Sequence, residues 1–336
     1  MTRPLPLLHI GFHKTASTLL QDMLFSDAKL GFCMLEDDRK AIHNAFILRG
    51  ALENQPDPAI VGNLRREEKC AADKGLNLVI SHERLSGYPA SGGFDQGIIA
   101  ERLHSAFPEA KVLMLIREQK SMIYSMYLQT ISDGGTLSLR RFLEPPEPGL
   151  LRKPGFRFDF YNYDRLIQKY HSLFGAENVL VLPFERLRSQ SEGTVRQIIE
   201  HCRGADQEPM QTLDHFSNSV NKGRPLAFQA LRRRMNLFLR NQLSENGLIT
   251  VPVNYVEKGV RKVVPAAEIL RPFDSILKPR MHRVIAEACA GRFEHSNRET
   301  ERLTGLDLGS LGYSLDTPDE SASAASGLED VRNDSD

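Results

Sequence analysis

A lysine and three hydroxyl side chains follow the first apolar run of the chain. Residues 7–10 read as a strand, and Gly11-Phe12-His13-Lys14-Thr15-Ala16-Ser17-Thr18 comes directly after it, before a helical pattern over 19–24. In such a strand-turn-helix unit, unpaired backbone N–H groups and the positive end of the helix dipole converge on one point. The hydroxyls can donate hydrogen bonds there, and Lys14 supplies a mobile cation. The pattern predicts an anion-binding loop over 11–18.

The loop does not have the spacing of a Walker A motif. That motif needs four residues between its first glycine and a Gly-Lys-Ser/Thr ending. Here Lys14 stands three positions after Gly11, and no glycine directly precedes it. We therefore expect the loop to hold a different nucleotide from the one that Walker A proteins bind.

Further polar residues stand where other predicted strands end. Apolar runs over 76–81, 111–116 and 178–182 alternate with helical patterns, among them 163–174. This alternation predicts an α/β fold with a central parallel sheet flanked by helices, in three layers. Ligands of such folds bind at the carboxyl ends of the strands. His82 and Glu83 follow the second run and Arg117 follows the third, so all of them should lie at that edge.

Arg117 is followed by two serines at helical spacing. Ser121 and Ser125 come four and eight positions later, on one face of a helix predicted over 120–128. An arginine fork beside an aligned hydroxyl can grip a second phosphate, remote in sequence from the first loop.

Composition narrows the class of protein. The chain has 336 residues with 43 Lys and Arg against 43 Asp and Glu, so no global basic field argues for nucleic acid. Its four cysteines have neither metal-ligand nor disulfide spacing, and no apolar run is long enough to span a membrane. We expect a cytoplasmic protein with no metal site and no membrane span; the oligomeric state stays open.

We expect one domain over 1–313. Its Gly/Pro-rich stretch 133–156 is predicted to be a flexible loop or lid, and a basic amphipathic helix is expected within 225–245. The residues from 314 to 336 are rich in Ser, Ala, Asp and Glu, which predicts a disordered acidic tail.

Four segments, in order along the chain, resemble sulfotransferases that use 3′-phosphoadenosine 5′-phosphosulfate (PAPS). Residues 11–18 resemble their 5′-phosphosulfate loop, and 115–127, with Arg117 and Ser125, resemble their 3′-phosphate site. Residues 174–187 resemble a strand-helix block of bacterial members. Residues 219–225 resemble the loop that closes over the cofactor phosphates. The resemblance implies a P-loop-like fold, PAPS as sulfuryl donor, and 3′-phosphoadenosine 5′-phosphate (PAP) as product.

The resemblance also implies roles for individual residues. Lys14 would contact the bridging oxygen and the transferring sulfuryl group. The 5′-phosphate would be held by the rest of the loop, namely Gly11, His13, Thr15, Ala16, Ser17 and Thr18. The 3′-phosphate would be held by Arg117 and Ser125, with help from the late loop Asn221, Lys222, Gly223 and Arg224.

A general base is expected beside the sulfuryl group, because the acceptor must lose a proton. The family places its base at the end of the second strand, as a histidine in some members and a glutamate in others. This chain has both, His82 and Glu83. The phrase Ser-His-Glu-Arg-Leu-Ser resembles bacterial carbohydrate-type enzymes and favours Glu83, with His82 open and His13 a third candidate.

The acceptor is expected to be a hydroxyl of a carbohydrate, a glycolipid or a small molecule. Aromatic residues between 156 and 163 could line an acceptor cleft, although core packing is the simpler fate for most of them. Two other functions stay open: an atypical P-loop nucleotide-dependent kinase, which would need an acidic metal ligand at a strand end, and a non-catalytic PAP-binding protein.

Overall fold

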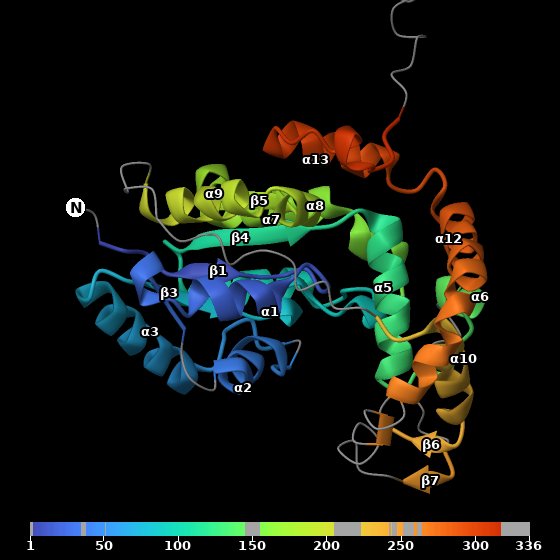
Figure 1. The fold of residues 1–336 in the computed structure, drawn as a ribbon. Helices are drawn as coiled ribbons and strands as arrows, with labels where there is room; N and C mark the ends of the chain where they lie inside the picture. The colour runs from blue at the N-terminus through green and yellow to red at the C-terminus, as the bar shows by residue number, and fades with distance from the viewer. Residues whose placement is uncertain are drawn as a thin grey trace, which may run out of the picture.

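A five-stranded parallel sheet forms the centre of the protein (Figure 1). In this computed structural model the described residues are 3–34, 38–50, 52–144, 155–204, 223–241, 243, 247–250, 259–260 and 264–316. The strands are β1 (Leu7–His9), β2 (Phe32–Cys33), β3 (Asn77–Ser81), β4 (Lys111–Ile116) and β5 (Val179–Pro183), in the spatial order β2-β3-β1-β4-β5. The predicted parallel sheet is confirmed. The two-residue strand β2 is too short for its pattern to stand out in the sequence.

Successive side chains of the strands enter two separate cores. Leu8, Ile80 and Val112 belong to one core, whereas Leu7, Val79 and Leu113 belong to the other, and all of them are buried. Because side chains alternate between the faces of a sheet, near-continuous apolar strands indicate that both faces are covered. The three-layer arrangement expected from the sequence is therefore present.

Helices cover both faces. The first core contains buried residues of α3 (Pro58–Asp73), α4 (Gln96–Ala106), α5 (Gln119–Ser132) and α7 (Tyr163–Phe174). The second contains residues of α1 (Ser17–Leu20), the π-helical turn η1 (Gln21–Phe25), α8 (Phe184–Ser189) and α9 (Ser191–Arg203). Further helices of the body, besides several 3-10 turns, are α2 (Asp38–Ile42), η3 (His43–Ile47), α6 (Leu139–Leu143) and α13 (Glu294–Thr304).

The aromatic residues between 156 and 163 pack into the first core. Phe156, Phe160, Tyr161 and Tyr163 are all buried, and Phe156 packs against Phe142 of α6 with ring centroids 4.6 Å apart. These residues fill the core rather than line an acceptor cleft. Of the stretch 133–156 predicted as a loop or lid, α6 lies within the described part and residues 145–154 lie outside the described residues.

A C-terminal arm, made of the described residues between 223 and 289, stands beside α5 at one end of the sheet (Figure 1). It contains α10 (Leu226–Met235), the short parallel pair β6 (Leu239–Arg240) and β7 (Ile249–Thr250), the 3-10 helix η10 (Glu268–Phe273) and α12 (Asp274–Cys289). The basic helix expected over 225–245 is α10, but it ends at Met235 and strand β6 follows at Leu239. Of the predicted tail, residues 317–336 lie outside the described residues.

Helix α5 begins where the sequence offers a capping carboxylate. Glu118 accepts hydrogen bonds from the backbone N–H groups of Lys120 and Ser121, at 3.1 and 2.8 Å. These bonds satisfy two of the donors that a helix start leaves without intrahelical partners. The cap fixes the direction in which α5 leaves β4, and so the place of Arg117 in the turn between them.

Candidate functional site

The strand order places β1 between β3 and β4, so the loop after β1 has two neighbouring strand ends. His9 pairs with Ser81 on one side and with Leu113 on the other, and all three strands run parallel. The segment after β3 therefore lies on one side of loop 10–16, and the segment after β4 lies on the other. Glu83 and Arg117 belong to these two segments.

The loop itself has an unusual backbone. Gly11, Lys14 and Ala16 have φ values of +97°, +60° and +64°. Ala16 precedes α1 without a side-chain capping bond, so no side chain caps the first N–H groups of this helix. Left-handed residues between right-handed ones turn successive backbone N–H groups toward a common point, where an anion can bind. The fold thus supplies the backbone donors that the sequence pattern predicts.

The hydroxyl groups of the loop have different partners. Thr15 is buried, and its Oγ1 donates a 2.5 Å hydrogen bond to the carbonyl of Phe12, so its proton holds the loop together. The Oγ of Ser17 is buried and has no partner within the described residues. A buried hydroxyl without a partner is costly, which fits a site where a ligand oxygen completes the bond. Thr18 is exposed.

Lys14 reaches across to α5. Its Nζ donates to Oε1 of Gln129 at 3.3 Å, and its side chain is exposed. Burial of the amine and the nearby Arg117 lower the pKa of Lys14, while Asp133 and Glu83 oppose this effect. Gln129 lies thirteen positions after the end of β4 and belongs to no recognisable motif, so its contact with the loop could not be predicted from the sequence.

His82 is occupied by a structural hydrogen bond. Its Nδ1 accepts the backbone N–H of Arg84 at 3.0 Å and so caps the 3-10 helix η4 (Glu83–Ser86). The ring is buried, stacks on His43 with centroids 5.9 Å apart, and has its pKa lowered by burial to about 4. A neutral ring whose Nδ1 accepts a bond carries its proton on Nε2, so neither nitrogen has a lone pair to offer.

Glu83 is a partly exposed carboxylate. Arg39 of α2 donates to its Oε1 at 2.8 Å, and 28% of the Glu83 side chain is exposed. Burial raises the pKa of this carboxyl, but its own backbone N–H, His82, Arg39 and His13 together lower it below the ordinary value. Glu83 is therefore ionised at neutral pH and can accept a proton.

The loop touches Glu83 directly through the backbone of Gly11. A Cβ on Gly11 would lie 3.0 Å from the Glu83 carbonyl oxygen and 3.2 Å from its Cα. Only glycine allows this approach at the observed φ. The next loop residue but one, His13, has a buried Nδ1 without a partner within the described residues, and burial lowers its pKa to about 3. His13 is thus neutral beside the carboxylate.

Arg117 approaches the loop from the opposite side. Its Nη1 donates to the backbone carbonyl of Lys14 at 3.0 Å, and its guanidinium lies 4.9 Å from the ring centroid of Phe184. Tyr163 donates to the Arg117 carbonyl at 2.6 Å and holds this turn against α7. Burial lowers the pKa of Arg117, but the group keeps its charge because the ordinary pKa of an arginine side chain is far above neutral pH.

The other residues expected at the second phosphate are only partly described. Ser125 lies half-buried on α5, two turns after Arg117. Gly223 and Arg224 precede α10, and the Gly223 carbonyl accepts a 2.7 Å bond from Arg271. Asn221 and Lys222 lie outside the described residues.

A buried polar network lies behind the loop. Nδ1 of His9 and Oγ of Ser81 are 2.7 Å apart, and Gln21 of η1 donates to the same oxygen at 2.8 Å. Burial lowers the pKa of His9 to about 4, so the ring is neutral. The network ties β1, β3 and η1 together beneath the anion loop. This role of His9 could not be predicted from the sequence, where it is a single histidine in an apolar run.

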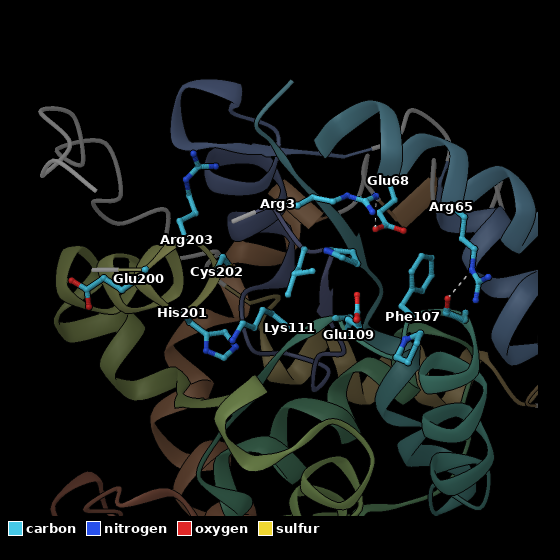
Figure 2. A pocket seen from close by; sticks show the side chains of 16 residues that line it. Arg3, Arg65, Glu68, Phe107, Glu109, Lys111, Glu200, His201, Cys202 and Arg203 are labelled. Carbon is cyan, nitrogen blue, oxygen red and sulfur yellow. Dashed lines mark hydrogen bonds and ion pairs between the residues drawn. The ribbon is translucent and has the colours of Figure 1, made fainter. Parts of the chain in front are cut away.

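A cavity of about 870 Å³ lies at the opposite, amino-terminal edge of the sheet (Figure 2). Its cations already have partners in the protein. Arg3 pairs with Glu68, Lys111 donates to Asn178, and Arg203 donates to the carbonyls of Gly31 and Gly75. Helices α4 and α9 end here, so their carbonyl ends face the cavity. Its chemistry therefore differs from that of the loop after β1.

Residues 99–208 match the model of the sulfotransferase family. The matched segment contains β4, α5, α7, β5 and α9, and with them Arg117 and Ser125. The match confirms the resemblance to sulfotransferases that the sequence motifs predict, and it supports sulfuryl transfer as the class of chemistry.

The chain is also similar to the crystal structure of a sulfotransferase from Alicyclobacillus acidocaldarius. The sequence identity is 20% and the TM-score is 0.44, with 69% of this chain and 93% of that chain covered. Among curated proteins, none matches this chain. Within the described residues, every helix is too short or too polar to cross a membrane.

Proposed function

We propose that this chain transfers a sulfuryl group from PAPS to a hydroxyl of a carbohydrate, a glycolipid or a small-molecule acceptor. The observation that carries the proposal is the arrangement around Lys14: an anion loop with Glu83 on one side and Arg117 on the other. The sulfotransferase match over 99–208 supports the same chemistry. For the location of the protein we propose the cytoplasm.

The groups around the loop fit a phosphosulfate. The unpartnered Oγ of Ser17 and the left-handed loop backbone suit the 5′-phosphate, and the Thr15 hydroxyl supports the loop instead of the ligand. Arg117 and Ser125 are proposed for the 3′-phosphate. PAPS, when bound, supplies a sulfuryl group on a phosphate leaving group. Lys14 and the loop N–H groups would stabilise charge that develops on that leaving oxygen.

Glu83 is the proposed general base. It is ionised and partly exposed, whereas His82 uses its Nδ1 to cap η4, and burial lowers the pKa of His13 to about 3, which makes that ring a poor proton acceptor. The carboxylate would take the proton of the acceptor hydroxyl as that oxygen attacks. A carboxylate with a lowered pKa is a weak base, so it must be close to the hydroxyl to act. The fixed contact between Glu83 and Gly11 supports such positioning.

Calorimetric titration with PAP tests the nucleotide part of the proposal. We expect saturable binding of PAP without Mg²⁺ and much weaker binding of ATP. Lys14→Ala should weaken PAP, whereas Lys69→Ala, an exposed lysine on α3, should not. A preference for ATP with Mg²⁺ would identify a nucleotide-dependent kinase instead.

Transfer of labelled sulfate from PAPS to a panel of sugars, glycolipids and phenols tests the reaction. We expect label in at least one acceptor and its loss in Glu83→Gln. Normal PAP binding with no transfer to any acceptor in the panel would indicate a non-catalytic PAP-binding protein.

A further inference from the structure

The C-terminal arm, residues 223–289, exposes large apolar side chains. Ile269, Phe273 and Ile276 are 80%, 53% and 69% exposed, and Leu231 and Met235 of α10 are 52% and 54% exposed. Single exposed apolar residues are common on protein surfaces, but a gathered group marks an interaction site. The arm therefore carries an exposed apolar surface of the kind that binds a partner.

The exposed residues of η10 and α12 form a stripe that continues into arginines. Phe273, Ile276, Arg280 and Arg283 recur at intervals of three or four positions, so they lie along one face. Both arginines are exposed. Lys278 falls on the other side of the same helix. The stripe thus combines apolar side chains at one end with cations at the other.

A small groove joins this stripe to α10. It has a volume of about 320 Å³ and is lined by apolar residues alone, namely Ala227, Leu270, Phe273, Ile276 and Leu277. On α10, Ala227, Leu231 and Met235 are spaced by four positions and share a face, and the exposed Arg234 borders it. Two helices thus present one apolar surface with arginines around it, which we call the arm surface.

The charge of the arm differs from that of the chain. Residues 223–289 contain twelve Lys and Arg against five Asp and Glu, whereas the whole chain contains 43 of each. Some of these arginines are used inside the protein: Arg232 donates to the Ser132 carbonyl and Arg233 to that of Thr136. Arg234, Arg280 and Arg283 stay exposed around the apolar residues, although Arg283 also pairs with the exposed Glu287 at 3.9 Å. The surplus of positive charge is local and complements an anionic partner.

We propose that the arm surface docks on an anionic phospholipid membrane. An apolar stripe flanked by arginines is the arrangement of interfacial helices, whose apolar side chains enter the headgroup boundary while the cations meet lipid phosphates. A second copy of the chain fits less well, because an isologous contact would bury the arginines of both copies in one interface. Nucleic acid would use the arginines but leave the apolar residues in water. This inference goes beyond the proposed transfer reaction and is tested without PAPS.

Co-sedimentation with vesicles tests the proposal. The full chain should bind vesicles of phosphatidylglycerol mixed with phosphatidylcholine, bind pure phosphatidylcholine much less, and lose affinity as salt rises. Ile276→Glu should abolish binding. Arg280→Glu/Arg283→Glu should weaken it by at least about 30-fold, from the contribution of two surface cations.

Matched variants separate the arm from the rest of the surface. Leu52→Glu changes an apolar residue that is 98% exposed on the body. Arg66→Glu/Lys69→Glu reverses two exposed cations at the same three-position spacing on α3. Both should bind vesicles like the unmodified chain, and circular dichroism should show that every variant is folded.

Four results would overturn the proposal. One is no binding to phosphatidylglycerol vesicles at low salt. Another is equal loss of binding in the arm variants and in their controls. The third is light scattering that shows a dimer which Ile276→Glu dissociates, because the arm surface would then be an interface between copies. Binding to a DNA duplex that Ile276→Glu leaves unchanged, in place of vesicle binding, would likewise count against it.

Discussion

The two sides of the loop after β1 are held by different kinds of contact. On the β3 side the main chain of Gly11 lies against the main chain of Glu83, and the carboxylate sits among His13, His82 and Arg39. On the β4 side, backbone hydrogen bonds of 2.8 and 2.7 Å join Phe12 and Gly11 to Leu115. Beyond them, the Arg117 side chain donates to the Lys14 carbonyl, and the Lys14 side chain donates to Gln129 of α5.

The main chain of the loop is therefore held on both sides, and the two sides differ in the side chains that they present. Glu83 follows β3 directly and its main chain lies against Gly11, whereas the Arg117 guanidinium can exchange the Lys14 carbonyl for a ligand oxygen. We infer that Glu83 on the β3 side is positioned for proton transfer and that the Arg117 side chain on the β4 side adapts to the nucleotide. The following changes test each side of that comparison.

Glu83→Gln should have the largest effect. The substitution keeps the size of the side chain and the backbone contact with Gly11, and it removes the proton acceptor together with the charge that pairs with Arg39. We expect kcat to fall by roughly 10²- to 10⁴-fold, the usual contribution of a general base, with PAP affinity unchanged. Steady-state transfer assays and calorimetry measure the two quantities.

His82→Asn is the matched control for that change. Asparagine can keep the cap of η4, since its side-chain oxygen can accept the Arg84 N–H. We expect kcat to stay within about tenfold of the unmodified value, well short of the loss for a base. A loss equal to that of Glu83→Gln would make His82 the base and would contradict the division proposed for the β3 side.

Arg117→Ala should have the next largest effect, on nucleotide affinity. Loss of charge-assisted hydrogen bonds should weaken PAP by about 1.5–3 kcal/mol. Adenosine 5′-monophosphate lacks the 3′-phosphate, so its affinity should fall much less. Calorimetry with both nucleotides gives the ratio, and Arg117→Lys, which keeps the charge without the fork, should lie between.

Equal losses for the two nucleotides would show that Arg117 serves the loop and not the 3′-phosphate. Its bond to the Lys14 carbonyl would then be kept in the complex, and the Arg117 side chain would not adapt to the nucleotide.

Gly11→Ala should destabilise the fold by a smaller amount. The left-handed conformation costs an L-residue about 1–2 kcal/mol, and the new Cβ would meet the Glu83 carbonyl oxygen at 3.0 Å. Urea unfolding measures the loss. Gly97→Ala, at an open position of α4, is the control and should be neutral or stabilising. Equal stability of the two variants would mean that the β3 contact is not rigid.

The sequence predicted the elements whose patterns are long and local. Helix α7 was expected over 163–174 and spans Tyr163–Phe174, and the main strands lie within a residue or two of their expected bounds. Strand β2 is only two residues long, which is too short for a repeating pattern of apolar residues to be recognised in the sequence.

Site residues could be predicted where a charged residue follows a strand end, because its side chain already indicates a chemical role, as for Lys14, Glu83 and Arg117. Their partners could not, because contacts such as Gln129 with Lys14, or Arg39 with Glu83, join residues 115 and 44 positions apart. The hydrogen bond of Thr15 within the loop could not be predicted either, since the sequence does not show whether a hydroxyl binds a ligand or a backbone carbonyl. Such outcomes depend on tertiary geometry, which local patterns do not encode.

Arg39→Gln should have the smallest effect and the most specific one. Arg39 is among the groups that hold the pKa of Glu83 below its ordinary value of 4.5, so its removal should raise that pKa. A base acts when deprotonated, so kcat/KM falls as pH drops through its pKa, and the acidic limb should move to higher pH in the variant. The ion pair adds stability above pH 4.5 that is lost as pH falls through the lowered pKa, and for so exposed a pair this is at most about 1 kcal/mol at neutral pH. A pH profile of transfer from pH 4 upward, with Arg49→Gln as a control of another ion pair, measures the shift. If the acidic limb of the pH profile does not move, Arg39 only orients α2. The low pKa of Glu83 would then come from the backbone and the histidines alone.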